Sequence, residues 1–432
     1  MAEASEPSPW LLRWQGCLPG SAAQQKRLGD LAGILLILLL AGLPLVTRTG
    51  LGLIVLACGA LWLLWSLTKP PERLGGISGW LLLFLGVAVL ATGFSPVPAA
   101  ALKGLVKLLS YLGVYALMRQ LLTVRPEWWV RLMAALLGGS LLTDVLALRQ
   151  LYAPTEELAR WADPNSVAEG TIRIYGPLGN PNLLAGYLVP ILPLALVACV
   201  RWRGWGSRMF AASAFILGCA SVLFSYGRGG WLALVAALGS LVLLLVLRAI
   251  RHWPPLWKRL VPLALLAAGG VLLALAVTQV DPIRTRVMSL LAGRGDSSNN
   301  FRINVWLAAI DMIQDRPWLG IGPGNAAFNS VYPLYQQPKF NALSAYSVPL
   351  ELLVETGLPG LIACIGLAFA SVRRGLKALA SDADLALPCI GCLAAITGLL
   401  VHGAADTIFF RPEVQISGWF CLATLSQCRP RA

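Results

Sequence analysis

The chain consists largely of long apolar runs separated by short segments of glycine, proline and charge, and this pattern limits it to a membrane fold. A helix needs about 20 predominantly apolar residues to cross a bilayer. Charged residues make up only 12% of the chain, against about 25% in an ordinary soluble domain. These features exclude a soluble enzyme and predict an all-α polytopic integral membrane protein with about 12 transmembrane helices. The predicted spans are 30–47, 50–68, 79–94, 101–118, 131–151, 183–200, 209–226, 230–247, 261–279, 347–370, 385–402 and 414–428.

The distribution of basic residues predicts how the chain is oriented in the membrane. The formal net charge is +14, and basic residues of polytopic proteins collect in cytoplasmic loops. With the N-terminus inside, most Lys and Arg fall on the cytoplasmic side, whereas three short outer connections hold one arginine each, Arg48, Arg228 and Arg411. We therefore expect a plasma-membrane protein with both termini in the cytoplasm and no nucleic-acid partner. Residues 1–29 form a cytoplasmic tail without a cleaved signal, and residues 30–432 form a single transmembrane domain.

Only two loops are long in this topology, 152–182 and 279–346, and both face the outside. Long loops in a compact protein are usually functional. The first loop ends in TIRIYGPLGNPNLLAGY, where prolines and glycines impose an irregular backbone and Asn180 and Asn182 are candidate caps for the following span. The segment is either a rigid turn that returns the chain to the membrane or a binding loop.

The second loop contains an amphipathic helix. Ile303, Trp306, Leu307, Ile310 and Ile313 recur at helical spacing, with cap candidates at 297–300 and a proline at 317. We expect this helix to lie along the outer membrane surface or over the bundle. The following GIGPG at 320–324 predicts a tight turn with a close backbone approach, because no strand precedes it as a nucleotide-binding loop would require.

Two pairs of charged residues lie within predicted spans. Glu351 and Glu355 form one pair, and Lys103 and Lys107 form the other. Each pair has i, i+4 spacing and so occupies one helix face, and we expect the two faces to meet. Ionisable groups at membrane depth are costly and indicate a functional site, although an ion-pair ladder that fixes helix register is the structural alternative.

Three arginines on the outer side are candidates for an anion site. Arg228, in SYGRGGW, lies between two closely spaced spans and must sit at the outer membrane boundary. With Arg173 and Arg302 from the two loops it would form a cationic pocket for an anion such as a pyrophosphate or bicarbonate. The alternative is that an interfacial arginine extends to the lipid headgroups.

His402 ends the eleventh predicted span on the outer side, and Asp406 follows four residues later. The carboxylate is placed to orient the imidazole for catalysis, although a histidine at a helix end is often structural. No motif implies a metal or a cofactor.

These motifs carry a family resemblance. The run from RIYGPLGNPNLLA through SYGRGGWL to NNFRINVWLAAIDMIQDRPWLGIGPGN and LELLVETGLPG resembles the O-antigen ligase and polymerase superfamily of bacterial envelope proteins. The stretch 296–360 is most similar to its cyanobacterial branch, the inorganic carbon (bicarbonate) transporter B family. The resemblance implies a polytopic helical fold with a large outer loop over a lipid-facing cavity.

The resemblance also implies residue roles. In the ligases two arginines bind the pyrophosphate of an undecaprenyl-linked glycan, and their positions fall on Arg228 and Arg302. A histidine that activates the acceptor hydroxyl is replaced here by Tyr346, a poor general base because an ordinary tyrosine pKa is near 10. His402 would substitute for it only if the eleventh span packs against the Arg228 turn.

Three functions are consistent with these features. The first is transport or accumulation of bicarbonate across the plasma membrane, and the second is glycan transfer from a polyprenyl-pyrophosphate donor at the outer leaflet. The third is a non-catalytic protein that binds a lipid-linked anion. All three have membrane lipid as a partner, together with bicarbonate or a polyprenyl-pyrophosphate-linked glycan.

Overall fold

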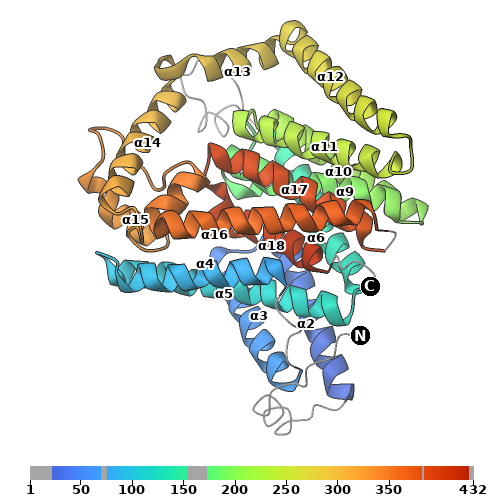
Figure 1. The fold of residues 1–432 in the computed structure, drawn as a ribbon, viewed down its shortest axis with the longest axis horizontal. Helices are drawn as coiled ribbons and strands as arrows, with labels where there is room; N and C mark the ends of the chain where they lie inside the picture. Colours follow the sequence, from blue (N-terminus) through green and yellow to red (C-terminus); the bar gives the residue numbers. More distant parts are fainter. Residues whose placement is uncertain (1–21, 70–74, 153–172, 382–383, 428–432) are drawn as a thin grey trace.

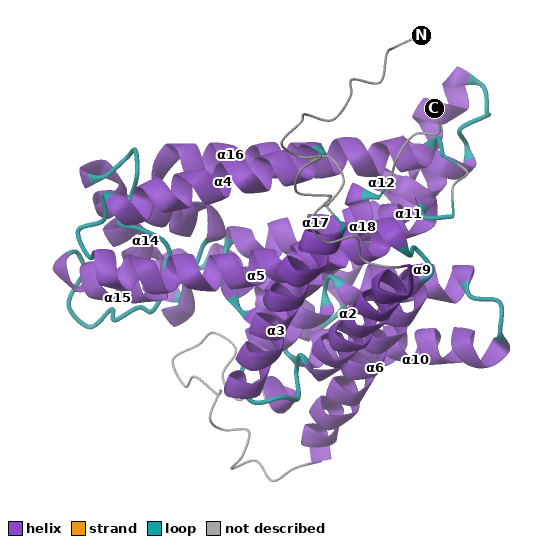
Figure 2. Cartoon of the chain, turned by 90° about the horizontal axis from the view of Figure 1, so that it is seen from below, coloured by secondary structure: helices purple, strands orange, loops and turns teal. Residues whose placement is uncertain are grey.

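A computed structural model describes residues 22–69, 75–152, 173–381 and 384–427, and these segments form helices and no strand (Figures 1 and 2). The main helices are α2 (Ala22–Gly42), α3 (Arg48–Thr68), α4 (Gly76–Gly93), α5 (Pro98–Val124), α6 (Trp128–Arg149), α8 (Pro181–Leu188), α9 (Ile191–Arg201), α10 (Trp205–Phe224), α11 (Arg228–Ala249), α12 (Pro255–Gln279), α13 (Asp281–Leu291), α14 (Ser297–Asp315), α15 (Asn325–Val331), α16 (Val348–Leu379), α17 (Ala386–Ala404) and α18 (Pro412–Ser426). The predicted all-α fold is confirmed.

Each predicted span coincides with a helix, or with two helices in one case. Ten of the described helical segments are long and apolar enough to cross a membrane. The other two predicted spans fall on α2 and on α18, which has 15 residues. Several boundaries differ from the prediction, and the ends of α5 at Val124 and α16 at Leu379 lie beyond the predicted 118 and 370. α2 begins at Ala22, inside the predicted tail, and the span 183–200 is divided into α8 and α9 around Pro190, because proline cannot donate to the helical ladder.

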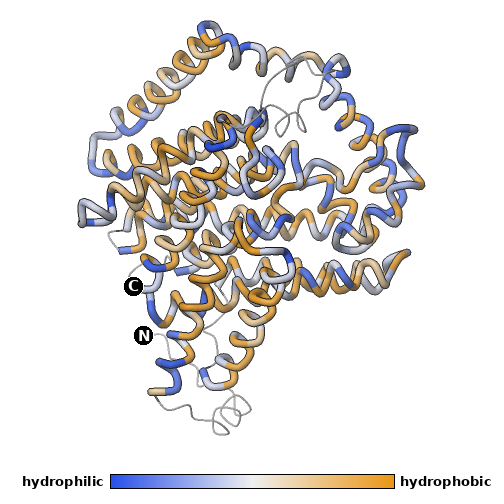
Figure 3. Tube along the Cα trace, turned by 180° about the vertical axis from the view of Figure 1, so that it is seen from behind, coloured by the Kyte–Doolittle hydropathy of each residue, from blue (hydrophilic) through white to orange (hydrophobic). Residues whose placement is uncertain are grey.

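The helices form a bundle in which α11 packs along α17 and α4 packs along α16. Close approach depends on small residues: a side-chain Cβ on Gly398 of α17 would lie 2.8 Å from Ala237 Cβ of α11. α12 is the exception, because none of its described side chains is buried. In Figure 1 it stands away from the bundle and joins α13, which arches back to α14. The tube in Figure 3 shows that α12 is nevertheless apolar over most of its length.

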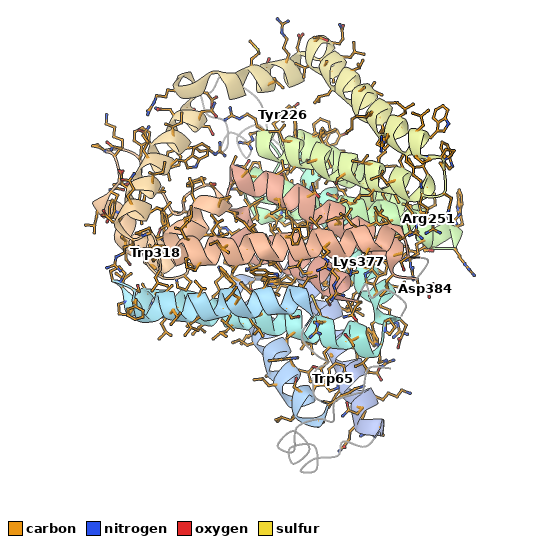
Figure 4. All side chains as sticks on the ribbon, viewed as in Figure 1. Trp65, Tyr226, Arg251, Trp318, Lys377 and Asp384 are labelled. Atoms are coloured by element: carbon orange, nitrogen blue, oxygen red, sulfur yellow. The ribbon has the colours of Figure 1, made fainter. Side chains whose placement is uncertain are left out.

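One end of the bundle is basic. Arg248 donates hydrogen bonds to the carbonyls of Ala378 and Ser381, 2.7 and 2.6 Å away, and Arg374 donates to Ser426 O. These arginines therefore neutralise the negative ends of the helices beside them. Figure 4 places Arg251, Lys377 and Asp384 at this end and Trp318 at the opposite end. Following the predicted orientation, we call the end that carries α13, α14 and α15 the outer end.

The second long loop, 279–346, forms a layer of helices and not an irregular segment. We call it the outer layer. The predicted amphipathic helix is present as α14, but its buried face differs from the prediction: Val305, Ala308, Ala309 and Met312 are buried, whereas Leu307 and Ile310 are exposed. The small alanines allow α14 to approach the bundle closely. Larger apolar residues then remain outside, where a membrane surface would cover them.

The GIGPG turn locks this layer onto α16. Pro359 has no N–H, so the carbonyl of Glu355 lacks its helical donor. The Leu358 N–H donates to Pro317 O, so the carbonyl of Val354 lacks its donor as well. Ile321 N and Gly322 N replace them, donating to Val354 O and Glu355 O over 2.9 and 3.0 Å. The predicted close-approach turn is thus confirmed, and it is paired with a kink in α16.

Gly357 makes this kink possible, with φ of 66°. A Cβ at this position would lie 2.3 Å from the carbonyl carbon of Trp318, and this positive-φ conformation with ψ of −167° is essentially restricted to glycine and costs about 1–3 kcal/mol for a residue with a side chain. We therefore expect Gly357→Ala to lower the thermal unfolding midpoint of the detergent-purified protein.

Gly239→Ala is the matched control. Position 239 lies in α11, and no described atom is within 4 Å of its added Cβ. This control should leave the midpoint unchanged or raise it, because alanine favours a helix over glycine. Equal midpoints for the two variants would contradict the role assigned to the kink.

Candidate functional site

The candidate site residues converge at the outer end of the bundle. Arg228 is the first residue of α11, and His402 lies in the last turn of α17. A Cβ on Gly229 would lie 3.1 Å from His402 Cδ2, so the histidine packs directly against the turn that carries Arg228. The condition under which His402 would replace the family histidine is therefore met.

Arg228 is held by the outer layer. Its guanidinium forms a buried ion pair with Asp296, with Nη2 2.9 Å from Oδ1, and its Nη1 donates to the hydroxyl and carbonyl of Ser289. Asp296 is also the N-cap of α14, where Oδ1 accepts from Asn299 N. Arg228 thus fastens α11 to both α13 and α14, and the structure does not place it as an interfacial residue extended to headgroups.

Arg302 retains unused binding capacity. Its Nη1 donates to Ser298 Oγ at 2.9 Å, and its Nη2 lies 3.9 Å from Asp406 Oδ2, too far for a hydrogen bond. The buried Nε has no hydrogen-bond partner among the described residues. Burial lowers the pKa of the Arg302 guanidinium, and Asp406 opposes that shift. A buried guanidinium with an open N–H is suited to an anion.

Asp406 connects the two long loops. Its Oδ2 accepts a hydrogen bond from Asn182 Nδ2 over 3.1 Å, and its Oδ1 accepts from the N–H of Thr407. Asn182 Oδ1 in turn accepts from Arg173 Nη2 at 2.9 Å, and Arg173 Nε donates to Ser225 O beside the Arg228 turn. Arg173 therefore positions Asn182 and the Arg228 turn in this structure.

Asn180 has the capping role predicted for it. Its Oδ1 accepts from the N–H groups of Asn182 and Leu183 at the start of α8. Asn182 does not cap α8; its side chain joins the Asp406 network. The first loop therefore ends in a rigid turn that also supplies a polar group to the site, which combines the two alternatives left by the sequence.

His402 is not oriented by Asp406 as expected. No hydrogen bond joins their side chains in the described structure, and His402 Nδ1, although buried, has no partner there. Asp406 is occupied by Asn182, Thr407 and Arg302 because the chain turns away from α17 after Ala404. The Cδ2 and Nε2 edge of the imidazole packs against the Arg228 turn, and the buried Nδ1 keeps its capacity to accept a proton.

Tyr346 occupies a strained position, with φ of 50°, and packs edge-on against Phe301 with ring centroids 5.3 Å apart. Burial raises the pKa of Tyr346, and the charge of Asp406 raises it further. The phenol is therefore protonated at neutral pH and suited to donate a hydrogen bond. It cannot serve as the base that the family histidine provides.

A cavity of about 990 Å³, called here the outer cavity, opens beside these residues. Tyr346, Asp406, Asn180 and Asn182 line it, together with the charged residues Arg48, Lys107, Glu351, Arg411 and Glu413. Its polar lining is suited to a hydroxyl-rich ligand.

The intramembrane charges do not form an ion-pair ladder, the structural alternative, although Lys107 and Glu355 line one cavity. Lys103 is exposed, and no ion pair joins either lysine to Glu351 or Glu355 in the part of the chain that the structure describes. Glu351 accepts a hydrogen bond from Ala345 N at 2.5 Å, beside Tyr346. The Glu355 carboxyl faces the N–H of Gly324 and the carboxyl of Glu351. The glutamates therefore hold the outer layer in place.

Asp296 and Ser289 are site residues that the sequence did not reveal. Asp296 precedes the predicted caps at 297–300 by one residue. Aspartate is itself a preferred N-cap residue, so this preference was the signal that could have identified it. Ser289 carries no comparable signal, because its contact with Arg228 depends on how α13 folds back over the bundle. Within the described segments, no group of three or more His, Cys, Asp or Glu residues is placed to hold a metal ion.

Residues 188–365 match the family model described as O-antigen ligase. The matched segment runs from the end of α8 to the middle of α16 and contains Arg228, Arg302 and Tyr346, whereas His402 and Asp406 follow it. It covers less than half of the chain and supports a relation to the superfamily. No curated protein matches the chain. Its placement in the cyanobacterial branch stays a prediction.

The Arg228–Asp296 pair predicts a stability effect. Removing the arginine leaves a buried carboxylate without its partner, a change that typically costs about 3–5 kcal/mol. We expect Arg228→Ala to lower the unfolding midpoint strongly and Arg228→Ala with Asp296→Ala to recover part of the loss. Thermal unfolding in detergent measures both variants. Additive losses in the double variant would contradict the pairing.

Proposed function

We propose that this protein binds a polyprenyl-pyrophosphate-linked glycan at the outer leaflet and transfers the glycan to an acceptor hydroxyl. The observation that carries the proposal is the juxtaposition of the buried Arg302, which has an open N–H, with the Arg228 turn and His402. The match of residues 188–365 to the O-antigen ligase family supports the same reaction class.

The arginines account for binding and for stabilisation of the leaving group. Arg302 donates to the pyrophosphate, whose negative charge grows as the bond to the sugar breaks. Arg228 holds α13 and α14 around that position and adds positive charge beside it. Their planar guanidinium groups suit phosphate oxygens better than an ammonium group does.

His402 is the proposed general base that activates the acceptor hydroxyl. In the proposed step the acceptor oxygen attacks the anomeric carbon of the donor sugar, and the bond from that carbon to the pyrophosphate oxygen breaks. The bonding electrons leave with the polyprenyl pyrophosphate, and the acceptor proton moves to a nitrogen of His402. Asp406 keeps the surrounding turn in place through Asn182 and Thr407.

Bicarbonate transport remains a prediction that no contact among the described residues supports. The guanidinium groups would bind bicarbonate as they bind phosphate, so the site alone does not distinguish the two ligands. A non-catalytic lipid-binding role rests on the same arginines and differs only in whether His402 accepts a proton.

A reconstituted sample separates these functions. Proteoliposomes would be assayed in parallel for turnover of a lipid-linked oligosaccharide and for uptake of labelled bicarbonate. We expect glycan turnover that Arg302→Ala lowers at least 100-fold, because the loss of one such donor typically costs about 10²–10³ in rate. Lys103→Ala is the control, since Lys103 is exposed and outside the site. Bicarbonate uptake without glycan turnover would overturn the proposal.

The roles of His402 and Tyr346 can be tested by substitution. His402→Ala should lower the turnover rate about 10²–10⁴-fold, the usual contribution of a general base. Tyr346→Phe should retain turnover within about tenfold, because a phenol whose pKa is raised donates a hydrogen bond at most. Loss of turnover in Tyr346→Phe with activity preserved in His402→Ala would reverse the assignment.

A further inference from the structure

A second cavity lies deeper in the bundle and is almost entirely apolar. It has a volume of about 290 Å³ and is bounded by α4, α5, α16, α17 and α18. Along α16 its lining extends from Val348 to Ser371, which corresponds to about 35 Å of helix and so to most of the thickness of a bilayer. We call this cavity the apolar groove. Its length and lining suit a hydrocarbon chain lying parallel to the helices.

The apolar groove meets the outer cavity at one point. Lys107, Tyr111, Asn325 and Phe410 line both of them. A molecule with a hydrocarbon chain in the groove would therefore place its polar end in the outer cavity and would pass Lys107 at the junction. Such a two-part site, apolar within the membrane and polar above it, matches the shape of a lipid.

Lys107 is the cation at this junction. Its Nζ donates to the carbonyl of Phe410 at 3.3 Å and lies 5.8 Å from the centre of the Tyr111 ring. No carboxylate lies within ion-pair distance of it in the described structure. An ammonium group has three N–H donors, so Lys107 can bind a further acceptor. Since an ammonium group at membrane depth is costly without a partner, an anion is the expected one.

We propose that the apolar groove binds an anionic membrane phospholipid, with one acyl chain along α16 and its phosphodiester against Lys107. This site is separate from the arginine site, because neither Arg228 nor Arg302 lines the described parts of the groove or the outer cavity. The inference therefore goes beyond glycan transfer and does not depend on it.

The charge at the junction favours a phospholipid over a polyprenyl pyrophosphate. Glu355 lines the groove with Lys107, and Glu413, Arg411 and Arg48 line the outer cavity near the lysine. These three cations and two carboxylates leave a net charge of +1 around the junction, which one phosphodiester balances better than the several charges of a pyrophosphate. A lysine also binds phosphate as a point charge, whereas the arginine site offers the planar donors that a pyrophosphate needs.

The test is lipid binding to the full-length protein in detergent, measured by native mass spectrometry. The probes are phosphatidylglycerol, phosphatidylcholine with the same acyl chains, and undecaprenyl phosphate. We expect the wild type to prefer phosphatidylglycerol over phosphatidylcholine. Lys107→Ala should weaken binding of phosphatidylglycerol about fivefold, the effect of one lysine near a lipid phosphate, and Lys107→Arg should retain it. Lys103→Ala, one turn away on the same helix, is the matched control and should have no effect.

A second variant tests the groove itself. Ala368→Phe adds a ring to the lining without changing charge and should weaken both phospholipids equally, whereas Lys107→Ala affects only the anionic one. Equal affinity of the wild type for the two phospholipids would overturn the proposal, and so would an equal loss in Lys103→Ala and Lys107→Ala. Displacement of phosphatidylglycerol by equimolar undecaprenyl phosphate would assign the groove to the polyprenyl chain instead. Glycan turnover is not the readout, so the failure of either proposal is distinguishable from failure of the other.

Discussion

The position of the outer layer depends on two backbone carbonyls of α16. Inside a helix the carbonyls of Val354 and Glu355 would accept from the N–H groups four residues later. In this chain the Leu358 N–H donates to Pro317 O instead, and Pro359 has no N–H. A buried carbonyl without a donor is costly, so another segment has to supply one. The GIGPG turn does so, and its glycines allow the approach that the hydrogen bonds need. The carbonyls that the kink in α16 leaves without helical donors thereby become the attachment point for α14, α15 and the residues they carry.

The polar site is built on shared acceptors more than on direct pairs. Asp406 accepts hydrogen bonds from Asn182 and Thr407 and lies near Arg302. Asp296 accepts a hydrogen bond from Arg228 and caps α14. Each carboxylate therefore joins elements that are far apart in the sequence. This arrangement leaves one nitrogen of Arg302 and one of His402 without partners in the described structure, and these are the groups that a ligand can use.

Periodicity and charge predicted the helices because both act locally. Apolar runs, prolines and glycines placed the spans, and the turn at 320–324 followed from short-range rules, whereas the cap of α14 lies one residue before the predicted range. Which side chains pair within the site was harder to predict from the sequence. His402 and Asp406 have the spacing of partners on a helix, yet α17 ends between them and the chain turns away. Lys103 and Glu351 have the right periodicity and depth, but which helix faces meet is decided by packing across the whole bundle. Ser289 had no signal at all, because its role arises from a fold-back of α13.

α12 has a consequence for how the site responds to its surroundings. With no buried side chain among its described residues, this helix takes its tilt and depth from the lipids that surround it and not from the bundle. Only Val280 separates it from α13, and α13 carries Ser289, which holds Arg228. A change in bilayer thickness that re-tilts α12 would thus reach the arginine along a short covalent path. The thickness of the bilayer would in this way influence the position of Arg228 in the anion site.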